Sequence, residues 1–337
     1  MSVEVVRDLE HFSQLCEEWG AFVSNQTTLT PFQTPVWLLT WWKHFGNGEL
    51  RVFIFRCESA IAAVIPCFLH TWHGRRQLTL IGSGVSDYLE PPMASEHSIE
   101  VTYELANCLI RANEWDVCNW QDLDHDTAMA GLARVRSLYV QECDDTPSSE
   151  IPIRGTWDEF YRDRPHGLRR NLRRYLEKAE RIDKPEFVVK LCADSELIDA
   201  LIRLHAARWL RHGESGMIRA NGSEEFLREA TAHFSSKNML RLFALRFQGK
   251  IVSVILSFSY GKTIFPYLSG FDPEYEEFGF GRLLLERSLH YAFENKYYSW
   301  NFLRGNEPYK FDWGAQEIRK TRLIISRESV RTDPRIR

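Results

Sequence analysis

The sequence lacks long apolar runs and an excess of charge of either sign. No stretch approaches the roughly 18 apolar residues of a membrane span, and Met1 to Glu10 carry charges where a signal peptide has an apolar segment. Lys and Arg number 42 and Asp and Glu 46, which leaves a net charge of −4. We therefore expect a cytoplasmic protein without a transmembrane segment. General binding to nucleic acid is not expected, because it rests on excess basic charge.

The cysteines also lack a pattern. The seven cysteines are scattered, with no C-x-x-C pair and no His at the spacing of zinc ligands. These absences predict buried thiols and no metal site. No cysteine stands beside a candidate His in the sequence, so we expect group transfer without a covalent enzyme intermediate.

An internal repeat organises the chain. A length of 337 residues, with 44% hydrophobic and 26% charged residues, is typical of two globular domains. Leu50 to Arg56 matches Leu240 to Arg246, and Ile61 to Ile65 matches Ile251 to Ile255; 240 − 50 and 251 − 61 both give 190. Each pair has the β-branched and aromatic content and the polar turn of a hairpin.

The two halves continue alike after the hairpins. Each adds a third strand, a Gly-containing turn with an acidic residue, a helix and another strand; these are Gln77–Gly82, Asp87, Ser98–Ala112 and Asp116–Leu123 in the first half, and Thr263–Gly270, Asp272, Gly281–Asn295 and Tyr297–Leu303 in the second. A polar loop at 143–150 marks the boundary. We predict two tandem α/β halves with mixed sheets, residues 1–150 and 151–337, the second ending in a strand from Lys320 to Ser326.

The turn before the second helix has the chemistry of a phosphate site. Gly279 and Gly281 let backbone N–H groups approach a pyrophosphate, and the helix N-terminus adds partial positive charge. Phe280 contributes its amide, and Arg282 can contact phosphate directly. Ser269 and Gly270, at the end of the preceding strand, complete the predicted cofactor set. The alternative is a tight turn with no ligand.

Several motifs resemble one family. Glu276-x-x-Gly279-x-Gly281 resembles the pyrophosphate loop of the GNAT (acyl-CoA N-acyltransferase) clan, and Phe302 to Gly314 resembles its C-terminal block, a strand ending in Gly followed by Glu-x-Tyr-Lys and Trp. Further pieces are similar to the CelD/BcsL-like acetyltransferases of that clan; they are Phe32-x-Thr34-Pro35-x-Trp37 with Trp41, Asp87-Tyr88, and Leu204-His205-x-x-Arg208-Trp209. Glu276 departs from the family pattern, which has Gln or Arg there, and an acid cannot donate to a phosphate.

The resemblance implies tandem GNAT folds, of which the second binds acetyl-CoA or another acyl-CoA as co-substrate. It also implies a role linked to cellulose or other exopolysaccharide synthesis. In the first half, Pro91 and Pro92 follow the glycine turn and block an immediate helix, so that half has a degenerate cofactor loop and is expected to shape the acceptor site. The same tandem architecture occurs in FemABX-like peptidyltransferases, which use aminoacyl-tRNA.

Acyl transfer from a thioester needs a base for the acceptor and an acid for the leaving thiolate. Glu307, just after a strand end, is the candidate base, with a role at the start of a helix as the alternative. Tyr309 is the candidate acid, or a packed ring. His205 is the second candidate base, or a solvated residue on a packed helix.

Six further residues are candidates for binding the acceptor. Arg208 and Trp209 share a helix face with His205. Asp87, Tyr88 and Asp272 follow Gly-containing strand ends, where an Asp is also a common turn residue. Lys310 can hold an acidic acceptor or a CoA phosphate, or be solvated.

The predicted function is transfer of an acyl group, acetyl in the first instance, to an amine or hydroxyl of a small-molecule or sugar-containing acceptor. Two alternatives stay open, an aminoacyl-tRNA-dependent transferase and a non-catalytic GNAT pair that binds partner proteins. The basic run from Arg162 to Lys178 is typical of a solvated helix face; its functional alternatives are a CoA 3′-phosphate, an anionic glycan and peripheral membrane association.

Overall fold

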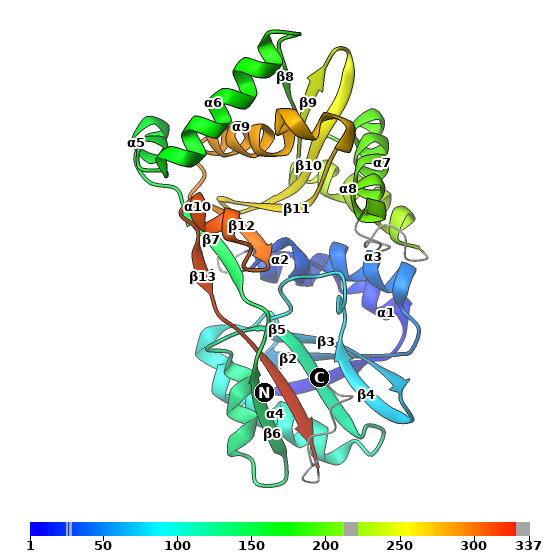
Figure 1. The fold of residues 1–337 in the computed structure, drawn as a ribbon. Helices are drawn as coiled ribbons and strands as arrows, with labels where there is room; N and C mark the ends of the chain where they lie inside the picture. Colours follow the sequence, from blue (N-terminus) through cyan, green and yellow to red (C-terminus); the bar gives the residue numbers. More distant parts are fainter. Residues whose placement is uncertain (25, 27–28, 212–221, 328–337) are drawn as a thin grey trace. The chain divides into compact units, whose positions relative to one another are not determined.

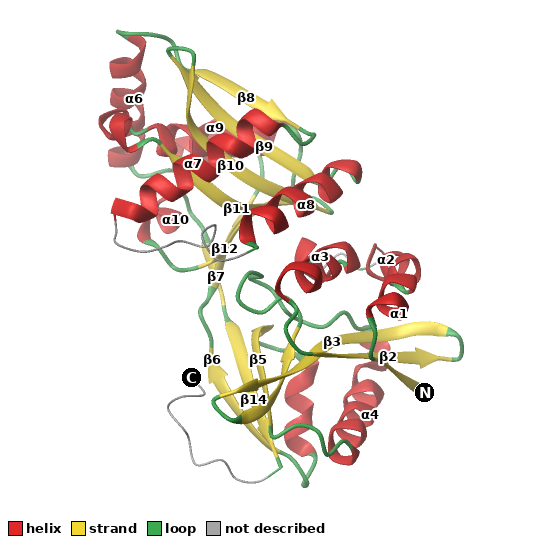
Figure 2. Cartoon of the chain, turned by 90° about the vertical axis from the view of Figure 1, so that its right-hand side faces the viewer, coloured by secondary structure: helices red, strands yellow, loops and turns green. Residues whose placement is uncertain are grey.

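The computed structural model describes residues 1–24, 26, 29–211 and 222–327 and divides the chain into two compact units (Figure 1). Unit 1 comprises Met1–Pro147 and the chain from Arg319 onward, and unit 2 comprises Ser148–Ile318. Each unit contains one seven-stranded mixed sheet in its described part, with helices packed against it (Figure 2). The predicted α/β class with mixed sheets is confirmed.

The sheet of unit 1 has the strand order β1-β2-β3-β4-β5-β14-β6, and only β4 and β5 pair in parallel. Helix α4 buries Val101, Leu105 and Leu109 against this sheet. The strands are β1 (Ser2–Val6), β2 (Glu49–Cys57), β3 (Ala60–Trp72), β4 (Arg75–Leu80), β5 (Val117–Asp124), β6 (Tyr139–Asp144) and β14 (Lys320–Ser326), and the α-helices are α1 (Leu9–Gln14), α2 (Cys16–Ser24), α3 (Pro35–Phe45) and α4 (Ser98–Arg111).

The sheet of unit 2 has the order β13-β7-β12-β11-β10-β9-β8, and only β11 and β12 pair in parallel. Helix α9 buries Leu284 and Leu289 in a core shared with Phe243 and Trp300. The strands are β7 (Ser148–Pro152), β8 (Glu186–Lys190), β9 (Leu240–Phe247), β10 (Lys250–Tyr260), β11 (Thr263–Phe271), β12 (Ser299–Arg304) and β13 (Gln316–Ile318), and the α-helices are α5 (Trp157–Arg162), α6 (His166–Glu180), α7 (Ser195–Arg211), α8 (Ser223–Ser236), α9 (Phe280–Glu294) and α10 (Pro308–Asp312).

The element order repeats between the units, as the sequence repeat predicts. The run β2-β3-β4-α4-β5 in unit 1 corresponds to β9-β10-β11-α9-β12 in unit 2. The last strand of each run carries a bulge with a residue in the left-handed region, Asp122 at φ 56° in β5 and Leu303 at φ 63° in β12. Non-glycine residues rarely adopt this conformation, so its recurrence supports duplication.

One strand lies in the other sheet from the one expected. Lys320–Ser326 forms β14, which pairs antiparallel with β5 and β6 in unit 1 rather than closing unit 2. The chain leaves unit 1 after Pro147 and returns to it after Ile318. Strand β7, which begins at Ser148, already pairs with β12 of unit 2. Leu323 and Ile325 are fully buried in the unit 1 core, because β14 is an interior strand.

In unit 1 the chain itself continues the sheet beyond the end of β4. Strands β4 and β5 pair only from Gln77–Val117 to Thr79–Asn119. Farther along, Leu89 donates its N–H to the Asp122 carbonyl (3.1 Å), and Ala94 donates to the Ala62 carbonyl of β3 (2.8 Å). The segment from 89 to 94 therefore takes the place next to β5 that β4 has left.

A charged cluster lies under this segment. Glu90 accepts hydrogen bonds from the Asp124 N–H (3.1 Å) and the Thr127 hydroxyl (2.8 Å). Lys320, fully buried on β14, pairs with Asp124 (2.6 Å), and its ammonium lies 3.4 Å from the centroid of the Tyr88 ring. Although part of the Glu90 surface is exposed, burial of its carboxyl group and the nearby Asp124 charge raise its pKa to about 8.

This pKa predicts a pH-dependent stability. Folded protein keeps the Glu90 proton up to about pH 8, whereas the unfolded chain loses it near the ordinary value of 4.5. The folded state binds more protons between these values, so the free energy of unfolding should fall as the pH rises from about 5 to about 8. Glu90→Gln should remove much of this slope in urea unfolding experiments, because an amide keeps hydrogen-bonding capacity without a charge.

Glu10→Gln, at an exposed position, is the control and should leave the slope unchanged. Burial lowers the pKa of Lys320, which gives an opposite slope at alkaline pH, so the comparison belongs below pH 8. An equal slope in wild type and Glu90→Gln would contradict the assignment.

Candidate functional site

Strands β11 and β12 stop pairing partway along their length. They pair at Thr263–Ser299 and Ile264–Trp300 and, among the described residues, nowhere beyond. Farther along β11, Pro266 to Leu268 are half-buried and Ser269 is exposed, although β11 is an interior strand. A bulge against β10 inserts Tyr267 as an extra residue at this point. Bulges of this kind are frequent beside active sites.

The loop between β11 and α9 has the geometry of an anion site. Asp272 accepts a hydrogen bond from the Glu274 N–H (3.0 Å) and so caps the short helix η5 (Pro273–Phe278). Gly279, in the left-handed region (φ 58°), is the N-cap residue of α9. No side chain caps this helix start with a hydrogen bond. The first N–H groups of a helix have no partner within the helix, so those of Phe280 and Gly281 suit an anion.

The side chains of this loop divide between core and surface. Phe280 is buried and stacks with Phe278 (5.4 Å between centroids), so only its backbone is available to a ligand. A Cβ atom at Gly279 would lie 2.6 Å from the Tyr175 ring of α6, whereas one at Gly281 would lie 3.5 Å from Phe271, an ordinary contact. Arg282 is exposed and donates to the Tyr175 hydroxyl (3.1 Å).

His205 is held against β11 by close helix packing. A Cβ atom at Gly270 would lie 2.8 Å from the His205 backbone nitrogen, so glycine lets α7 approach the strand. The buried imidazole places Nδ1 3.2 Å from the Ser269 carbonyl oxygen. A carbonyl oxygen only accepts, so Nδ1 carries the proton and Nε2 is the basic nitrogen of the neutral ring.

The end of β12 is shaped by a buried lysine. Lys310 donates to the carbonyls of Arg304 (2.9 Å) and Gly305 (3.0 Å) and pairs with the Glu307 carboxylate (2.9 Å). Its ammonium is thus occupied by the loop itself, which suits a positioning role. Glu307 stands at the N-cap position of α10 without a capping hydrogen bond, and its side chain is 55% exposed. Tyr309 is exposed and packs edge-on against Phe302 (5.9 Å).

The predicted site residues thus fall into three groups. The first group lies in unit 2, where β11 and β12 stop pairing. Ser269 and Gly270 belong to β11 and the Gly279–Arg282 loop comes after it, whereas Glu307, Tyr309 and Lys310 come after β12. Asp87 and Tyr88 belong to unit 1. Arg208 and Trp209 are in α7, but their side chains lie outside the part that the structure describes.

Sequence reasoning missed two residues of this region, Tyr175 and Asn301. Tyr175 on α6 touches the Gly279 loop, yet in the sequence it is one more residue on an apolar stripe. Asn301 is buried, accepts from the Leu303 N–H (2.9 Å) and donates to Glu150 (3.0 Å), and so holds the left-handed turn of β12. The one feature of the sequence that points to Asn301 is its position as a polar residue within an apolar strand.

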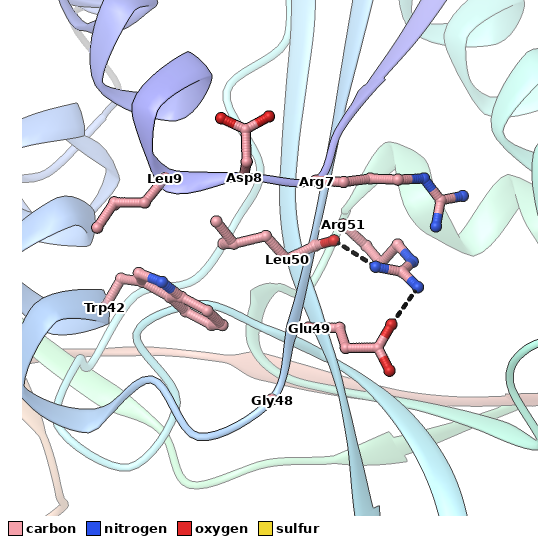
Figure 3. A pocket seen from close by; sticks show the side chains of 8 residues that line it. All are labelled: Arg7, Asp8, Leu9, Trp42, Gly48, Glu49, Leu50 and Arg51. Atoms are coloured by element: carbon pink, nitrogen blue, oxygen red, sulfur yellow. Dashed lines mark hydrogen bonds and ion pairs between the residues drawn. The ribbon is translucent and has the colours of Figure 1, made fainter.

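A separate pocket of about 440 Å³ lies in unit 1 (Figure 3). Its charged side chains are already in use. Arg51 pairs with Glu49 (2.6 Å), Arg7 pairs with Glu114 (3.3 Å), and Asp8 caps α1 by accepting from the His11 N–H (2.8 Å). The pocket therefore offers little uncompensated charge to a ligand.

Comparison with known proteins identifies the fold. Residues 166–311 match the model of the acetyltransferase (GNAT) domain, and no curated protein matches the chain. FemX superposes with a TM-score of 0.66 at 11% identity, covering 96% of this chain and 97% of FemX. A Bacteroides thetaiotaomicron protein of unknown function gives 0.60 at 10% identity, covering 96% and 100%.

A third structure is the C-terminal domain of a putative lysylphosphatidylglycerol synthetase from Agrobacterium fabrum, with a TM-score of 0.56 at 13% identity, covering 94% of this chain and 92% of that one. At such identities the likeness shows the fold alone. The protein therefore has a GNAT-like mixed α/β fold, and residues 166–311 are similar to the GNAT acetyltransferase domain. Within the described residues, no helix is both long and apolar enough to cross a membrane.

The two loop glycines are expected to differ in their tolerance of a side chain. Gly279→Ala places a methyl group in the left-handed region and against the Tyr175 ring, so it should lower the free energy of unfolding by about 1–3 kcal/mol. Gly281→Ala should leave it unchanged within about 0.5 kcal/mol or raise it slightly. Urea unfolding of both variants measures the difference, and equal losses would show that the Tyr175 contact is not as described.

Proposed function

We propose that this protein is an acyltransferase that moves an acyl group, acetyl in the first instance, from acyl-CoA to an amine or hydroxyl of a small-molecule or sugar-containing acceptor. One juxtaposition carries the proposal. The strand whose pairing with β12 ends early, β11, leads through the short helix η5 into the glycine loop that opens α9. The match of residues 166–311 to the GNAT acetyltransferase domain supports it.

The loop is suited to the pyrophosphate of CoA. The amides of Phe280 and Gly281 lie in the first turn of a helix, where they have no partner within the helix. Arg282 adds a charged donor on the exposed side. Glu276 is exposed and cannot donate to a phosphate, so the backbone and Arg282 would carry the binding.

The divergence of β11 and β12 suits the pantetheine arm. Where two neighbouring strands part, their edges present backbone groups that pair with an extended chain, as in strand addition. Pantetheine carries two amides that can make such bonds. The thioester would then lie between the two strands, with Ser269 on one side and the loop after β12 on the other.

The chemistry follows from the groups at that end. The acceptor nitrogen or oxygen attacks the thioester carbonyl, the tetrahedral intermediate collapses, and the carbon–sulfur bond breaks to release CoA. Glu307, paired with Lys310, takes the acceptor proton, directly or through a water molecule. His205, with Nε2 as its basic nitrogen, is the alternative base. Tyr309 protonates the departing thiolate.

In unit 1, an acceptor-binding role of Asp87 and Tyr88 stays a prediction. The segment from 89 to 94 occupies the place beside β5, so the equivalent of the acyl-CoA site in unit 1 is filled by the chain. A link to exopolysaccharide synthesis rests on the CelD/BcsL-like motifs and stays a prediction. The aminoacyl-tRNA-dependent alternative stays open, because the likeness to FemX concerns the fold alone.

Calorimetric titration of acetyl-CoA tests the cofactor. Wild type should bind with micromolar affinity, and Gly281→Val should abolish binding because a branched side chain pressed against Phe271 would displace the loop amides. Gly167→Val on α6 is the matched control, since a Cβ atom there meets open space, and it should bind like wild type. Thermal unfolding checks that both variants fold. No binding of acetyl-CoA or of longer acyl-CoAs would overturn the proposal and direct attention to aminoacyl-tRNA.

Substitution of Tyr309 tests the acid. With an acceptor found by screening amines and sugars for CoA release, Tyr309→Phe should lower kcat by about 100-fold and leave the Kd of acetyl-CoA unchanged, because proton donation acts only on the leaving thiolate. Phe311→Leu, at an exposed neighbouring position on α10, should retain wild-type kcat. An unchanged kcat in Tyr309→Phe would remove Tyr309 from the mechanism.

A further inference from the structure

Two arginines stand against one tyrosine ring beside the glycine loop. Helix α6 packs against η5 and α9 (Figure 1), and the Tyr175 ring lies against Gly279. The guanidinium carbon of Arg174 is 5.4 Å from the centroid of this ring, and that of Arg282 is 5.9 Å from it. The two charges are thus no farther apart than the sum of these distances.

These two charges are not neutralised. In the part of the chain that the structure describes, neither Arg174 nor Arg282 pairs with a carboxylate. Half-buried arginines elsewhere do so, as in Arg228 with Asp199 (2.6 Å) and Arg246 with Glu196 (3.0 Å). Even Lys178, one turn from Arg174 on the same helix, is paired, with Glu277. Like charges brought together without a counter-ion repel, and a bound anion relieves that repulsion.

The size of the pair indicates the kind of anion. Guanidinium groups beside a helix N-terminus suit a phosphate group, which arginine binds through parallel N–H donors. The outward-facing residues of α6 include no exposed apolar side chain, since Leu168, Leu172 and Leu176 lie on the inner stripe. An interfacial membrane helix needs such side chains, so the helix is not built for insertion into lipid.

We propose that Arg174, with Tyr175 and Arg282, binds the 3′-phosphate of CoA. This inference rests on the proposed function, because it presumes that the pyrophosphate occupies the Gly279–Arg282 loop. The 3′-phosphate is a monoester that carries up to two negative charges and is attached to the ribose next to the pyrophosphate. Tyr175 holds the Arg282 guanidinium through its hydroxyl (3.1 Å) and separates the two arginines. The protein then selects CoA over dephospho-CoA, which lacks only this group.

Titration with acetyl-CoA and with acetyl-dephospho-CoA tests the site. Wild type should bind acetyl-CoA about tenfold or more tightly, the worth of a charged hydrogen bond. Arg174→Ala should lower the affinity for acetyl-CoA to near that for the dephospho compound and leave the latter unchanged. Arg174→Lys, which keeps the charge without the planar fork, should fall between the two.

Arg170→Ala is the matched control, because Arg170 is exposed one turn away on α6, makes no described contact with Tyr175, and carries the same charge. It should preserve the preference for acetyl-CoA. Equal affinity of wild type for both compounds, or an equal loss for both in Arg174→Ala, would overturn the phosphate site while leaving CoA binding intact. Binding of neither compound would instead overturn the proposed function, and this inference with it.

Discussion

The parting of β11 and β12 is the constraint on which the rest of unit 2 depends. Two parallel neighbours in an interior position would normally pair along their whole length, but these stop after Ile264 and Trp300. The cause lies in β12, where Leu303 adopts a left-handed conformation (φ 63°) and the register against β7 shifts. The Asn301 side chain accepts a hydrogen bond from the Leu303 N–H, and Lys310 donates to the carbonyls of Arg304 and Gly305. Buried polar groups thus sustain a turn that leucine would not adopt alone.

The same divergence has opposite consequences in the two units. In unit 1, Asp122 occupies the left-handed position, and the segment after the glycine turn binds back to β3 and β5. The buried Lys320, carried in by β14, and Glu90 close this arrangement. In unit 2 the corresponding segment instead turns at once into η5 and α9. The place beside β5 in unit 1 is thus occupied by the chain itself, whereas in unit 2 a glycine loop follows the strand that parts from β12.

Local patterns were sufficient to predict the repeated elements. Alternating and aromatic-rich runs identify the hairpins around 50–65 and 240–255, and helical periodicity identifies α4 and α9, because these signals depend on neighbours in sequence. Membership of a sheet does not. Nothing local to Lys320–Ser326 distinguishes a last strand of unit 2 from an interior strand of unit 1, since its partners β5 and β6 are almost two hundred residues away. The burial of Lys310 was likewise hidden, because lysine is ordinarily solvated.

The candidate site shows a further limit, since a residue's role depends on which charges meet in space. Lys310 and Arg174 are both basic residues, and nothing in the sequence distinguishes the surroundings of their charges. The Lys310 ammonium group contacts three backbone carbonyls and the Glu307 carboxylate, so its charge is compensated within the protein. Arg174 is exposed beside Arg282, and neither pairs with a carboxylate among the described residues, so the Arg174 charge is available to a ligand. The same logic distinguishes Arg51, which is paired with two carboxylates in the unit 1 pocket. In this protein two arginines beside a glycine loop, without a described carboxylate partner, are therefore a stronger indication of a ligand than a pocket whose charges are already matched.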